Sequence, residues 1–175
     1  MTTIKVDLTS KGLNKLEKDL KKYMRDFKQT KVRQFMMALS EKCADLVREN
    51  IISYQAVDTW DLYESIKVLM NKNYYKGQLR FFVVADSKHA CFVEFGTGSV
   101  GANSPYPFEL PEGVKWNYAS GKHIFQTKDG RYGWIYYKDG EFWFTEGMEA
   151  RPFMHDASMR VETYVESIAK EIFKS

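Results

Sequence analysis

Apolar residues recur at three- and four-residue intervals through the first third of the chain, which places them on one face of a helix. The residues of this stripe are Leu13, Leu16, Leu20, Tyr23 and Phe27. Ser10 is suited to cap the start of that helix. A second apolar stripe predicts another helix over about residues 30–52, and the alternation of apolar and polar residues over 4–8 predicts a short strand before the first helix.

The pattern becomes strand-like after residue 60. A short helical turn near Thr59 is predicted to lead into strands over residues 65–70, 79–85 and 90–95, which are rich in β-branched and aromatic residues and are separated by turn residues. We expect these strands to form an antiparallel sheet. The third ends at Gly96-Thr97-Gly98, where two glycines permit positive φ and a sharp change of direction.

Residues 99–147 differ in composition from the rest of the chain, because they hold 12 of its 27 aromatic residues. Three prolines predict an extended loop in the first half. In the second half the turn sequence Lys-Asp-Gly occurs at 128–130 and 138–140 between aromatic segments, which predicts a three-stranded β-meander. Because so small a sheet buries little by itself, we expect one aromatic face to pack on the domain or on a neighbouring chain.

Pro152 is suited to the start of a last amphipathic helix, which we expect to cover the sheet. The predicted fold class is α+β, with an antiparallel or mixed sheet packed by N-terminal and C-terminal amphipathic helices and an inserted aromatic three-stranded β-meander. A length of 175 residues suits one domain. We therefore predict a single α/β domain over 1–175, in which 99–147 is an inserted loop plus β-meander.

The charge is concentrated in the N-terminal part of the chain. Residues 1–50 carry a net charge of +5, whereas the whole chain carries +3. Basic residues recur on the predicted first helix opposite its apolar stripe. They are Lys11, Lys15, Lys18, Lys22 and Arg25. A lysine-rich helix face is most often simply solvated, and the alternative interpretation is that it faces DNA or an acidic protein surface.

The sequence offers no arrangement of residues typical of catalysis. The three histidines are scattered without a metal-ligand or nucleophile-base spacing, and Cys43 and Cys91 are too few and too far apart for a disulfide framework. We expect both thiols to be free and buried. We predict no catalytic, cofactor-binding or metal-binding residues and no enzymatic activity. No segment has the length and apolarity of a membrane span, and we expect no membrane partner.

Three motifs together resemble a known family. They are Thr59, Leu62, Ser65 and Ile66 in the pattern Thr-x-x-Leu-x-x-Ser-Ile, the run Phe92-Val93-Glu94-Phe95-Gly96-Thr97, and Ala150-Arg151-Pro152-Phe153. In this order they resemble the tail-completion or head-tail joining proteins of long-tailed bacteriophages, also described as phage morphogenesis or minor tail proteins. The resemblance covers roughly residues 1–98 and 148–175. Here Trp60-Asp61 stands where the family usually has a glycine, and the segment between the last two motifs is longer than typical.

The resemblance implies a structural virion protein of the tail or neck, assembled in the host cytoplasm. It implies a ring, commonly of six copies, at the head-tail junction, which completes the tail and joins it to the capsid connector. The expected partners are further copies of the chain, the connector and tail tube proteins, and DNA passing through the lumen. The residues expected at the interfaces are Glu94, Phe95, Gly96, Thr97, Gly98, Arg151, Trp134, Tyr136 and Trp143.

Two other functions are compatible with the sequence. The chain could be a small nucleic-acid-binding or processing protein that uses the basic N-terminal helix. It could also be a host-encoded binding module whose aromatic meander, with Trp134, Tyr136 and Trp143, grips carbohydrate or peptide.

Overall fold

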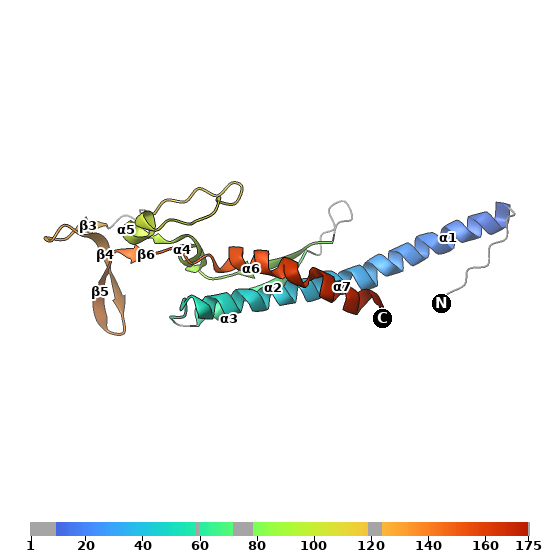
Figure 1. Cartoon of the computed structure of the whole chain (residues 1–175), viewed down its shortest axis with the longest axis horizontal. Coiled ribbons are helices and arrows are strands. Elements are labelled where there is room, and N and C mark those ends of the chain that lie inside the picture. Colours follow the sequence, from blue (N-terminus) through green and yellow to red (C-terminus); the bar gives the residue numbers. More distant parts are fainter. Residues whose placement is uncertain (1–9, 59, 72–78, 119–123, 175) are drawn as a thin grey trace.

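The computed structural model describes residues 10–58, 60–71, 79–118 and 124–174. The strand predicted over 4–8 and most of the turn that follows residue 70 lie outside these ranges. The molecule is elongated: a long helix extends to one end, and a small β-sheet lies at the other (Figure 1). The segments between them form the body that contains the core.

The two predicted N-terminal helices form one continuous helix. The helix α1 (Ser10–Phe27) leads through a π-helical turn (Lys28–Val32) into α2 (Arg33–Ser53), and Phe27, Val32 and Arg33 all keep helical dihedral angles. A π turn accommodates one extra residue without ending a helix. Because the helix is not broken, α1 projects beyond the body instead of folding back onto it (Figure 1).

The first two predicted strands are confirmed. After the short helix α3 (Asp61–Glu64), strands β1 (Ile66–Met70) and β2 (Phe81–Ala85) pair antiparallel, with Ile66 opposite Ala85. The prediction of a third strand over 90–95 is wrong, since Ala90–Phe95 is the helix α4. Apolar runs this short are compatible with either structure. Here Ala90 and Val93, which are three residues apart, both lie in the core, and this spacing is helical.

The predicted β-meander is confirmed as a second, three-stranded antiparallel sheet in the order β3 (Phe125–Gln126), β4 (Tyr132–Lys138) and β5 (Glu141–Thr145). Asp139 and Gly140 both have positive φ, as a two-residue Asp-Gly hairpin turn requires. The segment before the meander differs in part from the prediction. Residues 99–103 belong to the short helix α5 (Gly98–Asn103), and irregular chain follows it.

The C-terminal helix consists of α6 (Phe153–Val161), a 3₁₀ turn (Glu162–Tyr164) and α7 (Val165–Lys174). We expected this helix to cover the sheet. Instead α6 packs along α2, and it is α2 that contacts β1 and β2. With helices and antiparallel sheets in one chain, the fold class is α+β, as predicted. The predicted division into one domain with an insertion over 99–147 stays a prediction.

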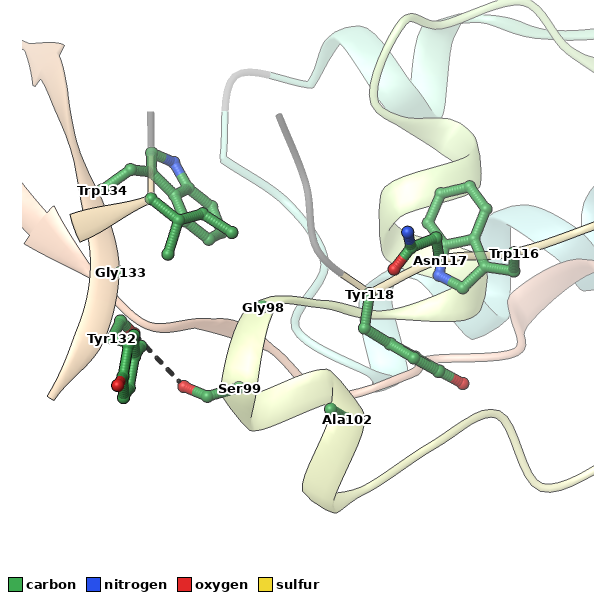
Figure 2. Close-up of a pocket in the computed structure, with 10 residues that line it drawn as sticks. Gly98, Ser99, Ala102, Trp116, Asn117, Tyr118, Tyr132, Gly133 and Trp134 are labelled. Atoms are coloured by element: carbon green, nitrogen blue, oxygen red, sulfur yellow. Dashed lines mark hydrogen bonds between the residues drawn. The ribbon is translucent and has the colours of Figure 1, made fainter. Parts of the chain in front are cut away.

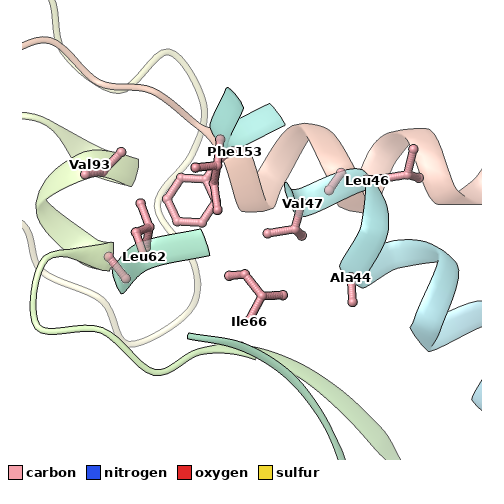
Figure 3. Close-up of a cluster of buried hydrophobic side chains, with 10 residues drawn as sticks. Ala44, Leu46, Val47, Leu62, Ile66, Val93 and Phe153 are labelled. Carbon is pink, nitrogen blue, oxygen red and sulfur yellow. The ribbon is translucent and has the colours of Figure 1, made fainter. Parts of the chain in front are cut away.

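The core lies where α2, α6, α3, α4 and the β1–β2 sheet meet. Leu46, Val47, Ile51 and Phe153 are fully buried there. Phe153 is the first residue of α6, and its ring lies among side chains from α2, α3 and α4 (Figure 3). The Ala-Arg-Pro-Phe motif therefore ends in the largest fully buried side chain among the described residues.

Replacing Phe153 by alanine should lower the free energy of unfolding by about 3–5 kcal/mol, because the change removes a fully buried aromatic ring and leaves a cavity. Denaturant unfolding followed by circular dichroism measures this loss. Phe142→Ala is the matched control: that residue is 77% exposed, and the loss of its ring should change stability by no more than about 0.5 kcal/mol. Equal losses in both variants would contradict the assigned core.

Candidate assembly interface

The two motifs on either side of the aromatic segment meet in space. Thr97 and Gly98 form antiparallel bridges with Met148 and Gly147 of the two-residue strand β6 (Gly147–Met148). Gly96 and Gly98 have φ values of +79° and +67°, as the sequence predicted for this turn. A Cβ at Gly98 would lie 2.1 Å from the carbonyl oxygen of Glu146, so the close approach of the two backbones requires glycine here.

Glu94 links α4 to the start of α6. Its carboxylate is buried and accepts hydrogen bonds from the backbone N–H groups of Met154 (2.9 Å) and His155 (3.1 Å). These are among the first N–H groups of α6, which have no partner inside the helix. The backbone N–H of Arg151 also donates to the carbonyl of Val93, at 2.8 Å. Burial raises the pKa of Glu94, although the two backbone hydrogen bonds favour its ionised form.

The irregular segment after α5 is tied to the same junction by aromatic contacts. The ring of Phe95 lies 5.0 Å from that of Tyr106 and 5.1 Å from that of Trp116, measured between centroids. The indole N–H of Trp116 donates to the carbonyl of Gly96, and the backbone N–H of Gly98 donates to the carbonyl of Tyr118. The turn at 96–98 is thereby enclosed from several sides.

The predicted interface residues over 94–98 therefore lie inside the subunit, and all five are buried. In the single chain they hold the junction between α4, β6 and α6. Arg151 is half-buried, and its guanidinium donates to the carbonyl of Gln55 at 3.2 Å. The role of these residues in contacts between chains stays a prediction.

Trp134 lines an apolar hollow of about 400 Å³ between β4, α5 and the segment around Trp116 and Tyr118 (Figure 2). Ser99 lies at its edge, where its hydroxyl donates to the carbonyl of Tyr132 at 3.3 Å. None of the lining residues carries a charge at neutral pH. The lining suits contact with apolar or aromatic groups and provides no acid, base or nucleophile pair for catalysis.

The end of the meander presents aromatic residues on both faces. Tyr136 and Trp143 are cross-strand partners and are 42% and 50% exposed. Tyr137 and Phe142 form the neighbouring pair on the opposite face. We call the following set the meander patch: Ile135, Tyr136, Tyr137, Phe142 and Trp143. The sequence analysis predicted Tyr136 and Trp143 as interface residues but not Ile135, Tyr137 and Phe142 on the opposite face. Successive residues of a strand point to opposite faces, so the aromatic neighbours of the predicted residues could have been included.

The α1 helix presents a second exposed apolar surface. We call Leu13, Leu16, Leu20, Tyr23 and Phe27 the α1 stripe. Leu16 is half-buried, and the other four are between 42% and 64% exposed. The predicted DNA-facing residues lie on the other side of the helix and are all exposed. They are Lys11, Lys15, Lys18, Lys22 and Arg25.

Other predicted features can be placed on the described part of the chain. Cys43 and Cys91 are free thiols, as expected, but Cys43 is half-buried and Cys91 is exposed, so the expectation of burial is wrong for Cys91. Among the described residues, no group of three or more potential ligand side chains is placed to hold a metal ion. Within the same ranges, no helix combines the length and apolarity needed to cross a membrane.

Comparison with known proteins points to bacteriophages. Residues 15–96, from α1 through α4 to Gly96, match the model of the HK97-gp10-like family, described as "Bacteriophage HK97-gp10, putative tail-component". The match confirms the resemblance to phage tail and head-tail proteins. It supports a tail-related structural component of the virion. No curated protein and no solved structure gives a significant match.

Gly98→Ala should destabilise the fold strongly, because positive φ costs a non-glycine residue about 1–2 kcal/mol and the clash with Glu146 adds about 1–3 kcal/mol. Thermal and denaturant unfolding measure the loss. Gly140→Ala is the matched control, since Gly140 has φ of +87° but open space around it, and it should show the first cost alone. Similar losses in both variants would mean that the close approach at Gly98 is unimportant.

Glu94→Gln should change how stability depends on pH. Because the pKa of Glu94 is raised in the folded chain above its unfolded value of about 4.3, the parent loses stability as pH rises from that value through the folded pKa. Glutamine does not titrate. The melting temperature of the variant relative to the parent should therefore increase from pH 4 to pH 8. The exposed substitution Glu109→Gln serves as the control, and a relative melting temperature that falls over this range would contradict the raised pKa.

Proposed function

We propose that this chain is a structural protein of a tailed phage that assembles into a ring at the head-tail junction, where it completes the tail and joins it to the capsid connector. The observation that carries the proposal is the family match over residues 15–96. It runs from Lys15, within α1, through α2, the β1–β2 sheet and α4, so it concerns much of the body. The expected partners are further copies of the chain, connector protein and tail tube protein.

The exposed surfaces support an assembly role. The α1 stripe and the meander patch lie at opposite ends of the elongated molecule (Figure 1). Exposed apolar patches of this kind commonly mark protein-protein contacts. Because the two surfaces are different and far apart, they can bind different neighbours at the same time. A subunit in a neck ring has this requirement, since it contacts both its own copies and the proteins above or below it.

We assign the meander patch to contact with a neighbouring protein of the particle. Its aromatic side chains supply large contact areas with few rotatable bonds, which favours them at interfaces. The hollow beside Trp134 could receive an apolar side chain of the same partner. In this arrangement the residues over 94–98 and Arg151 make no contact with the partner. They hold the meander in place relative to the body of their own chain.

The nucleic-acid-binding alternative is favoured by one observation, the row of five exposed basic residues on α1. If that face binds DNA, affinity should fall steeply with salt, because each phosphate contact releases counterions. The variant Lys15→Glu with Lys22→Glu would abolish such binding. Strong binding to duplex DNA by the purified parent, together with no binding to tail or connector protein, would favour this alternative over the ring.

Native mass spectrometry and particle imaging of the chain, alone and with tail tube protein, test the ring. The double variant Phe142→Ser with Trp143→Ala should keep the parent melting temperature to within a few degrees, since both side chains are exposed. It should nevertheless lower the yield of complete particles. Lys128→Ala, at the exposed turn of the meander, is the control. A parent chain that stays monomeric and binds neither tail nor connector protein would exclude the proposed role.

A further inference from the structure

The α1 stripe has the spacing of a coiled coil. Its five residues follow one another at intervals of three, four, three and four, which is a repeat of seven with an average period of 3.5 residues. This repeat keeps the apolar residues facing a second helix along the whole length of contact. The stripe therefore favours another helix over a sheet as its partner.

The chain's own C-terminal helix reaches one end of the stripe. The rings of Phe27 and Phe173 lie 5.8 Å apart, and the Lys31 ammonium donates to the carbonyl of Ile172, close to the end of α7, at 3.0 Å. Farther along α1, Leu20 and Leu13 remain 44% and 47% exposed in the described structure. Because α1 is a straight continuation of α2, it cannot turn back to bury them against its own body.

The charges of α1 are sorted around the stripe. In the seven-residue repeat, the three acidic residues of α1 occupy the two positions that flank the apolar core, and its six basic residues occupy the three outer positions. The flanking acids are Glu17, Asp19 and Asp26. In a coiled coil the flanking positions face the partner helix and set its orientation.

If the second helix is another α1, this distribution of charges favours a parallel pair of helices over an antiparallel pair. In the antiparallel arrangement each flanking position meets the same kind of position, so acidic residues would face acidic residues. In the parallel arrangement Asp19 would face Met24 of the second copy, and Glu17 would face Gly12 of the second copy, so no like charges are opposed. Rotation about a ring axis keeps equivalent helices parallel where they run along that axis.

We propose that the α1 stripe forms the core of a parallel coiled coil between copies of this chain. The assignment rests on the proposed ring, which supplies the second copy. The outer face, with its six basic residues, stays exposed to solvent in this coiled coil. The body and the meander patch are left available for the other proteins of the particle.

Cysteine cross-linking of the full chain tests the contact and its direction. In a background of Cys43→Ser and Cys91→Ser, Leu13→Cys should form a cross-linked dimer under oxidation or with a short bismaleimide, because equivalent core positions adjoin in a parallel coil. Lys18→Cys, on the outer face, is the matched control and should cross-link several-fold less. If instead Leu13→Cys cross-links only when mixed with Tyr23→Cys, the helices are antiparallel and the assignment is wrong.

A second variant separates this contact from the proposed function. Leu20→Glu places a charge in the core of the coil but lies far from the body, so its melting temperature should match that of the parent while its assembly is lost. Lys18→Glu should leave assembly unchanged. If Leu20→Glu forms the same ring as the parent, the coiled coil is excluded and the ring stands. If the parent itself forms no oligomer, alone or with tail tube protein, both fail.

Discussion

The structure depends on the contact between the end of α4 and the beginning of α6. There the buried Glu94 carboxylate accepts two backbone hydrogen bonds from α6, and the Arg151 N–H binds the Val93 carbonyl. These bonds join segments about sixty residues apart in sequence, and they place Phe153 in the core. A charged group is costly to bury unless it is well bonded. Here the bonds offset part of the cost, because they satisfy helix N–H groups that would otherwise lack partners.

The same junction positions the aromatic segment relative to the body. Two glycines with positive φ allow the chain to leave α4 and to pass within bonding distance of the returning strand β6. The rings of Phe95, Tyr106 and Trp116 then enclose the turn. Residues 92–97, which resemble a family motif, therefore act within the single chain as internal supports, and the exposed apolar surfaces lie on α1 and on the meander.

Much of the fold could be predicted from sequence, because strong periodicity and turn chemistry act locally. The Lys-Asp-Gly turns at 128–130 and 138–140 and the stripe of α1 are examples. The error at 90–95 arose because a short, mostly apolar segment fits a strand or a helix, and only the burial of Ala90 and Val93 in the core decides between them. The burial of residues 94–98 could not be predicted either, since it depends on contacts with Tyr106, Trp116 and Met154, which are distant in sequence.

Because α1 continues into α2 without a break, the two ends of this helix move together as one rigid rod. Leu46, Val47 and Ile51 fix one end in the core, whereas the other extends for about 27 Å at a rise of about 1.5 Å per residue. A tilt of about 10° at the body would move the tip of such a lever by about 5 Å. Whatever holds the tip therefore sets the orientation of the whole body. The π turn at Lys28–Val32, with its one additional residue, fixes the rotation of the lever about its own axis.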